Sequence, residues 1–316
     1  MLNENSIPSY GRTKDYLDLF RFSLGILSVI AVLAAGFIVY VLRGNSPNFI
    51  DFMFKNGVLP LDGLVLGIIA TLLLASAIES INDYFDVETD IANERYDRPI
   101  ARGAFSPQYV KNLSIAFFVM STAIISILVI VYDVTIALLG FTIIFILVGV
   151  FYNLGLKETG FIGNMWVSIG YVSPLFTGFF LLNPTEDFIL LACGLMIVVT
   201  FFLATGREIV KDIQDLAGDR SVNLKSLPVR IGPVKAGWIA SGLFLVAIIC
   251  ATLIGLLVYE NVVFWSLLVI LTLILGLTSY TILTEKELGG KKARKYTRWS
   301  LWIAMGAFFL GTFFIP

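Results

Sequence analysis

Histidine is missing from this chain of 316 residues, and cysteine occurs only twice. The absence of histidine excludes a zinc or haem site held through imidazole, and it also excludes a histidine general base. Cys193 and Cys250 each lie inside an apolar run, so we interpret them as small core residues and expect no disulfide framework. Charged residues make up only 14% of the chain, and the net charge of −1 implies no general attraction to nucleic acid.

Hydrophobic residues make up 58% of the chain, which is typical of a membrane protein. Nine apolar runs are long enough to span a bilayer, at about residues 18–42, 61–81, 110–131, 134–152, 163–182, 187–206, 236–258, 262–283 and 299–315. We therefore expect an all-α integral membrane protein, with nine transmembrane helices in a bundle and a single membrane-embedded domain over residues 1–316.

Lysine and arginine lie almost entirely on one side of the expected membrane. When every second loop is assigned to the side of the N-terminus, that side receives 20 of the 22 basic residues, and only Arg43 and Lys55 fall on the other. The positive-inside rule then predicts a multi-pass protein of the plasma membrane with a cytoplasmic N-terminus. Nine crossings place Pro316 outside.

Two acidic motifs, residues 82–90 and 211–219, each directly follow an apolar run and face the expected cytoplasm. Spacings of three, four and seven residues place three aspartates of each motif on one helical face. These are Asp83, Asp86 and Asp90 in the first motif, and Asp212, Asp215 and Asp219 in the second. Adjacent carboxylates repel one another, and a hard divalent cation that prefers oxygen ligands, such as Mg²⁺, relieves the repulsion.

Basic residues and turn signals follow each acidic motif. The basic residues are Arg95, Arg98 and Arg102 in the first loop, and Arg220, Lys225 and Arg230 in the second. Prolines and glycines in both loops mark turns between short helices, so the loops after the second and sixth spanning helices are expected to form a cytoplasmic cap over a central cavity.

The acidic motifs admit four interpretations. A solvated acidic face does not explain two matched clusters, and neither motif has the ligand pattern of an EF-hand. A cation transporter also uses acids, although usually in the middle of the membrane, and it remains the alternative from another class. Binding of a Mg²⁺-diphosphate explains acids and bases together, because the acids hold the metal and the bases neutralise the remaining phosphate charge.

The two motifs resemble the signature motifs of the UbiA superfamily of intramembrane prenyltransferases, and the resemblance covers nearly the whole chain. It implies a helical bundle around a central cavity, with Mg²⁺ and an isoprenyl diphosphate at the cytoplasmic mouth. By this resemblance the metal ligands are Asn82, Asp86 and Asp90 with Asp215 and Asp219, supported by Asp83 and Asp212.

The same resemblance extends to groups that would act on the diphosphate. Asp86 and Asp215 are the central acids of the two motifs, and Tyr152 and Lys157 match a Tyr…Lys element after the fourth helix. The residues expected to contact the diphosphate are Arg21, Arg98, Arg102, Asn153, Lys157, Arg207 and Lys211.

Within the superfamily, residues 206–219 and 97–103 resemble the enzymes of archaeal membrane lipid synthesis. That resemblance implies transfer of a geranylgeranyl group to a lipophilic acceptor, geranylgeranylglyceryl phosphate. An aromatic prenyltransferase acting on a quinone precursor such as 4-hydroxybenzoate is the alternative. The expected partners are these substrates and membrane lipid, with no nucleic acid and no obligate protein partner evident.

Overall fold

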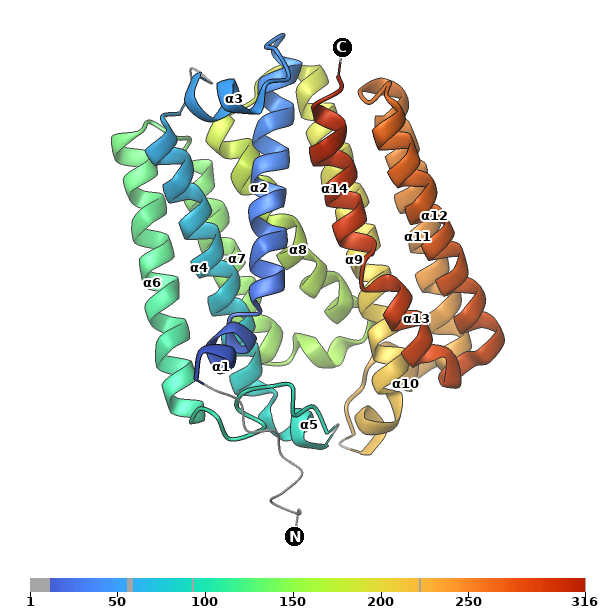
Figure 1. Ribbon diagram of the computed structural model, residues 1–316. Coiled ribbons are helices and arrows are strands. Elements are labelled where there is room, and N and C mark those ends of the chain that lie inside the picture. Colours follow the sequence, from blue (N-terminus) through green and yellow to red (C-terminus); the bar gives the residue numbers. More distant parts are fainter. Residues whose placement is uncertain (1–11, 56–58, 93, 222, 316) are drawn as a thin grey trace.

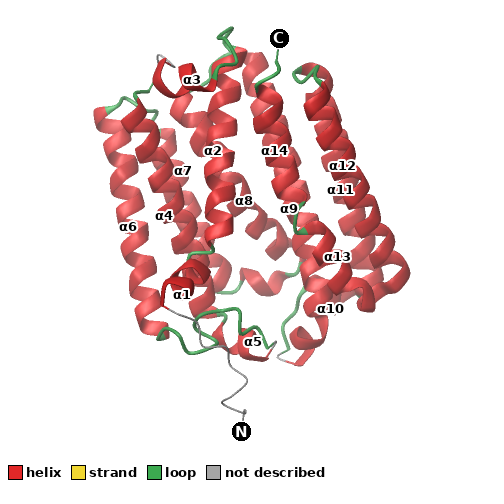
Figure 2. Cartoon of the chain, in the orientation of Figure 1, coloured by secondary structure: helices red, strands yellow, loops and turns green. Residues whose placement is uncertain are grey.

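The structure is a computed structural model that describes residues 12–55, 59–92, 94–221 and 223–315. Helices account for all of the regular structure in these ranges, and no strand occurs among them (Figure 2). The long helices are α2 (Phe22–Leu42), α4 (Leu61–Phe85), α6 (Pro107–Val131), α7 (Ala137–Asn153), α8 (Phe161–Leu182), α9 (Asp187–Ser221), α11 (Pro233–Leu257), α12 (Val262–Glu285) and α14 (Ser300–Thr312). The short elements are α1 (Arg12–Leu19), α3 (Phe49–Lys55), α5 (Val87–Ala92), α10 (Leu227–Ile231), α13 (Gly290–Thr297), and the 3₁₀ turns η2 (Leu156–Thr159) and η3 (Lys286–Gly289).

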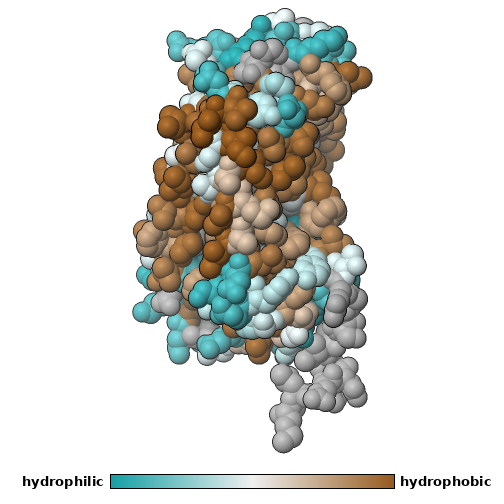
Figure 3. All heavy atoms as spheres, turned by 90° about the vertical axis from the view of Figure 1, so that its left-hand side faces the viewer, coloured by the Kyte–Doolittle hydropathy of each residue, from teal (hydrophilic) through white to brown (hydrophobic). Residues whose placement is uncertain are grey.

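The expected all-α membrane protein is confirmed. Seven helical segments in the described part of the chain are long and apolar enough to cross a membrane. One of them, Val262–Thr312, runs through α12, α13 and α14, and α7 is a shorter apolar helix of 17 residues. A count of nine crossings therefore requires α7 and α14 each to cross on its own. Figure 3 shows an apolar band between two polar ends on the face nearest α6.

The long helices stand side by side, with α4, α6 and α7 on one side of the bundle and α11, α12 and α14 on the other (Figure 1). The elements α1, α5 and α10 lie together at one end, which we call the motif end, and α3 lies at the opposite end. Between the two sides, α2 packs against α8. Their backbones approach closely at Gly178, where an added Cβ would lie only 2.3 Å from the carbonyl oxygen of Val32. Only glycine leaves room for this contact.

Helix α9 extends well past the predicted apolar run, which ended near residue 206. It continues to Ser221, and its 35 residues span roughly 52 Å at 1.5 Å per residue, well beyond a hydrocarbon core of about 30 Å. The extension is stabilised by burial of Ile209, Ile213 and Leu216, whose spacing is that of one helical face. The loop after α9 is consequently shorter than the sequence suggested.

The first motif behaves differently, because α4 ends at Phe85 and α5 begins at Val87. Asp86 is the C-cap of α4, with φ −92° and ψ 1°. The three aspartates expected on one face of a single helix, Asp83, Asp86 and Asp90, are therefore divided between α4, the cap residue and α5.

Candidate active site

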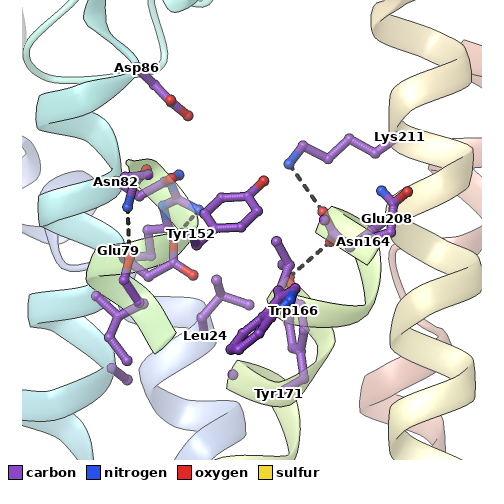
Figure 4. Close-up of a pocket in the computed structure, with 18 of the residues that line it drawn as sticks. Leu24, Glu79, Asn82, Asp86, Tyr152, Asn164, Trp166, Tyr171, Glu208 and Lys211 are labelled. Carbon is purple, nitrogen blue, oxygen red and sulfur yellow. Dashed lines mark hydrogen bonds and ion pairs between the residues drawn. The ribbon is translucent and has the colours of Figure 1, made fainter. Parts of the chain in front are cut away.

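A cavity opens between the two acidic motifs and extends into the bundle. Its wall comes from α2, α4, α5, α7, α8, α9 and α14. Figure 4 shows Asn82 and Asp86 on one side of this space, Glu208 and Lys211 on the other, and Tyr152 between them. The deeper wall includes apolar side chains such as Leu24, Leu27 and Phe145. A polar mouth above an apolar interior fits an amphiphilic ligand.

The first motif presents Asn82, Asp86 and Asp90 to the cavity. The Oδ1 atom of Asn82 is buried and has no hydrogen-bond partner in the structure. A buried amide oxygen without a partner is costly unless a ligand satisfies it, so this atom fits a cation ligand. Asp90 is 2% exposed, and Arg95 Nη1 lies 3.3 Å from its Oδ1. Burial raises the pKa of Asp90, although the charges of Arg95 and Arg98 oppose that shift.

Asp83 does not line the cavity. Its side chain is 1% exposed, and its Oδ1 accepts hydrogen bonds from Arg21 Nη2 at 2.6 Å and from Arg98 Nη1 at 3.1 Å. Arg21 also pairs with Glu79, and unlike Arg98 it reaches the cavity wall. Burial alone would lower the pKa of Arg21, but the charges of Glu79 and Asp83 outweigh it and raise the pKa. Asp83 thus fixes a permanently charged arginine beside the cavity.

The second motif presents all three aspartates, Asp212, Asp215 and Asp219, to the cavity from one face of α9, as expected. The Oδ2 atom of Asp212 accepts a hydrogen bond from Asn164 Nδ2 at 2.7 Å. The Oδ1 atom of Asp215 lies 3.7 Å from Arg294 Nη1, which comes from α13.

A buried carboxylate, Glu208, lies one helical turn before Asp212. Its two oxygens accept hydrogen bonds from Lys211 Nζ and Arg207 Nη1, each at 3.1 Å. Arg207 Nη1 also donates to the Tyr171 hydroxyl at 2.7 Å, and its guanidinium stacks on that ring. Lys211, Glu208 and Tyr171 line the cavity, whereas Arg207 supports them from behind.

Some of the remaining residues predicted to bind the diphosphate line the cavity, and others do not. Tyr152 and Asn153 line the cavity, and the Oδ1 atom of Asn153 is buried without a partner. Arg102 is held away from the cavity by Asp15 at 2.7 Å and Asp18 at 2.9 Å. Lys157 belongs to η2, but its side chain lies outside the described residues.

Several residues at the site were not assigned to it from the sequence. Arg95, Glu79 and Asn164 carry no motif of their own, and Arg294 is hidden among the basic residues of α13 that the positive-inside rule already explains. The signal that could have found Glu208 is its helical spacing of four from Asp212.

The donor set fits a hard divalent cation that keeps part of its shell for other ligands. All the donors are carboxylate or amide oxygens, which suit Mg²⁺. No group of three or more His, Cys, Asp and Glu side chains in the described ranges is close enough to enclose a metal alone. Mg²⁺ commonly binds one or two carboxylates and takes water and substrate phosphate for its remaining positions, which matches two acidic walls facing across a gap.

Known proteins are similar to this chain in sequence. The sequence profile of the UbiA prenyltransferase family matches residues 51–303. A digeranylgeranylglyceryl phosphate synthase from Saccharolobus solfataricus is 34% identical over 261 residues, which is 80% of this chain and 86% of that protein. The corresponding protein from Methanosarcina barkeri is 31% identical, over 76% of this chain and 78% of its own length.

Solved structures share the fold at low sequence identity. A structure concerned with digeranylgeranylglyceryl phosphate synthase in membranes has a TM-score of 0.69 and 21% identity, covering 96% of this chain and 99% of the solved one. A UbiA homologue from Archaeoglobus fulgidus bound to DMAPP and Mg²⁺ has a TM-score of 0.61 and 16% identity, covering 93% and 99%.

Proposed function

The chain belongs to the UbiA prenyltransferase family, and we propose that it transfers the geranylgeranyl group of geranylgeranyl diphosphate to geranylgeranylglyceryl phosphate. The product is a lipid with a second ether-linked chain. The protein is a multi-pass membrane enzyme. Membership of this family favours prenyl transfer over the alternative function of a cation transporter.

The observation that carries this proposal is the pair of acidic walls at the mouth of one apolar cavity. Asn82, Asp86 and Asp90 on one wall, and Asp215 and Asp219 on the other, would hold Mg²⁺ with the diphosphate between them. Bound Mg²⁺ supplies neutralisation of the diphosphate, which makes it a better leaving group. The solved homologue that holds DMAPP and Mg²⁺ supports the use of a prenyl diphosphate together with Mg²⁺.

The side chains of the protein orient the donor and exclude water. Arg21 and Lys211 bring fixed positive charge to the diphosphate from opposite walls. When the allylic C1–O bond breaks, its electrons leave with the diphosphate and a delocalised carbocation remains. The rings of Tyr152, Trp166 and Tyr171 line the cavity, where they keep water away and face the cation. The acceptor hydroxyl oxygen then bonds to C1, and it loses its proton once bonded because the oxonium is strongly acidic.

The choice of acceptor rests on the names of the archaeal relatives and on the surplus of cations near the mouth. Arg95 and Arg294 lie beside the two acidic motifs in addition to the Arg21 and Lys211 assigned to the diphosphate, and a second phosphate also needs neutralisation there. The relatives at 34% and 31% identity carry the name of the ether-lipid enzyme.

A product analysis tests the proposal. Purified protein in lipid nanodiscs receives geranylgeranyl diphosphate, Mg²⁺, and either geranylgeranylglyceryl phosphate or 4-hydroxybenzoate, and the products are identified by mass spectrometry. The proposal expects the diether phosphate, with formation stopped by chelator and restored by added Mg²⁺. Efficient prenylation of the benzoate without an ether product would make this chain an aromatic prenyltransferase.

The membrane arrangement follows from the same assignment. Nine crossings, with α7 and α14 each counted, place the N-terminus and both acidic motifs in the cytoplasm and the C-terminal end outside. The charge distribution supports this orientation, and the plasma membrane is the expected location. The segments carrying α5 and α10 form the cytoplasmic cap of one domain over residues 1–316.

A further inference from the structure

The N-terminus of α8 opens onto the cavity without a cap. Its N-cap residue is Gly160, and no side chain caps the helix. The first bond within the helix runs from the Asn164 amide to the Gly160 carbonyl at 3.1 Å, so the preceding amides have no partner from α8 itself. The unpaired amides and the helix dipole together favour an anion at this position.

Two buried polar side chains beside this helix end also lack partners. Ser226 is 5% exposed, and its Oγ has no hydrogen-bond partner in the structure. Asn164 is 6% exposed, and its Oδ1 is likewise without a partner, although its Nδ2 is used by Asp212. Both residues line the cavity, and Figure 4 shows Asn164 on the same side as Glu208 and Lys211. Since buried polar groups are nearly always satisfied, the two atoms point to a ligand.

These groups lie together because α8 begins against the start of α10. A Cβ on Gly160 would be 3.6 Å from the Cα of Leu227, the residue after Ser226, and 3.3 Å from the Cδ of Arg230. Gly160 has φ +68°, a conformation that favours glycine. The backbone turn therefore places the start of α8 against the residue that directly follows Ser226.

The hydrogen-bond donors and acceptors at this position indicate which polar groups a ligand would carry. The helix amides and the Ser226 hydroxyl donate hydrogen bonds, which suits the oxygens of a phosphate. The Asn164 oxygen only accepts, so it requires a donor such as an alcohol. A phosphorylated glycerol with a free hydroxyl carries both kinds of group.

We propose that the N-terminus of α8, Ser226 and Asn164 form a subsite for the acceptor, in which the amides and Ser226 bind the phosphate of a glycerol phosphate lipid and Asn164 accepts from its free hydroxyl. This deepens the proposed function and rests on it. The subsite lies on the wall of the second acidic motif, because Asn164 is bonded to Asp212. The acceptor hydroxyl is thus held beside the site where the diphosphate departs.

The test separates the two substrates kinetically. Ser226→Ala removes a hydroxyl that has no partner in the protein, so it should fold, and the acceptor KM should rise about tenfold, as expected for a hydrogen bond to a charged group. The KM for geranylgeranyl diphosphate should stay unchanged. With geranylgeranylglycerol, which lacks the phosphate, Ser226→Ala and the wild type should behave alike. Ser226→Thr, which keeps the hydroxyl, should retain most of the acceptor affinity.

The matched control is Ser114→Ala on α6. Ser114 is fully buried, lies away from the cavity, and donates to the Val110 carbonyl at 2.9 Å. Both KM values should be unchanged in this variant. The subsite is overturned if the KM for the diphosphate rises in Ser226→Ala, or if the phosphate-free acceptor shows the same loss. Ether product from the wild type with an unchanged acceptor KM in Ser226→Ala overturns the subsite alone, whereas no ether product from the wild type overturns the proposed function as well.

Discussion

Asp83 and Asp86 lie three positions apart in the first motif and have different surroundings. Asp83 is closed off from the cavity by Arg21 and Arg98, whereas Asp86 lies on the cavity wall at the break between α4 and α5. The sequence alone treats them as equivalent members of an acidic cluster. Their roles separate because removing one partner of a buried ion pair leaves the other charge uncompensated, whereas a carboxylate on the cavity wall can reach a bound cation.

We predict that Asp83→Asn destabilises the protein by about 3 kcal/mol, because it leaves two buried arginines without their shared carboxylate. Thermal or denaturant unfolding in detergent micelles measures the change. Asp86→Asn is the matched control, and it should keep the stability of the wild type while losing turnover. Equal stability of Asp83→Asn and the wild type would contradict the supporting role of Asp83.

The sequence predicted which residues lie at the site where those residues belong to the acidic motif itself. Asn82, Asp86 and Asp90 reach the cavity as expected. Arg294 and Asn164 could not be predicted, because each meets its aspartate only through packing of separate elements. Charge patterning also placed Arg102 at the diphosphate, whereas the structure pairs it with Asp15 and Asp18 of α1.

At the scale of the elements, α13 is the least expected contributor to the site. Its first residue packs directly on α9, where a Cβ on Gly290 would lie 2.8 Å from the Cα of Gln214. This contact brings Arg294, one turn further along α13, to Asp215. The contact depends on backbone approaching backbone, which no hydrophobic pattern reveals.

We therefore expect Gly290→Ala to push α13 away from α9 and to weaken the pairing of Arg294 with Asp215. Unfolding should become easier by about 1–3 kcal/mol, the usual cost of overpacking, and turnover should fall. The control is Gly242→Ala on α11, because nothing lies within 4 Å of an added Cβ there. Unfolding midpoints and steady-state rates of both variants measure the effects. A Gly290→Ala variant indistinguishable from Gly242→Ala would argue against the close contact.

The two acidic motifs show which helix boundaries the sequence can predict. The continuation of α9 to Ser221 could have been predicted, because Ile209, Ile213 and Leu216 repeat at helical spacing. The break in α4 has no proline or glycine to mark it. On one side of the break Asp83 pairs with Arg21 and Arg98, which are distant in sequence, and such pairing cannot be inferred from local propensity.

For the whole molecule, composition and apolar runs were sufficient to predict an all-α membrane bundle, and each run has a helix in the structure. The orientation in the membrane stays a prediction based on charge. The polar end that carries both motifs also carries most of the basic residues, so one topology experiment tests the mouth of the cavity as well.

Single cysteines placed at exposed positions test that topology. In a background in which Cys193 and Cys250 are replaced, Asp97→Cys and Lys225→Cys should react with an impermeant maleimide only after the cells are permeabilised. Glu260→Cys, at the opposite end of the bundle, should react in intact cells. Labelling of either motif-end cysteine in intact cells would show that the predicted orientation is wrong.

The most direct test of the central claim is Mn²⁺ binding, measured by electron paramagnetic resonance with the unreactive thiolodiphosphate analogue of the donor. If the two acidic walls jointly hold the metal and the diphosphate, binding should be strong only with the analogue present, and it should fall at least tenfold in both Asp86→Ala and Asp215→Ala. The control Ser114→Ala should bind as the wild type does. Mn²⁺ binding that is unchanged in either aspartate variant would contradict a site shared by the two motifs.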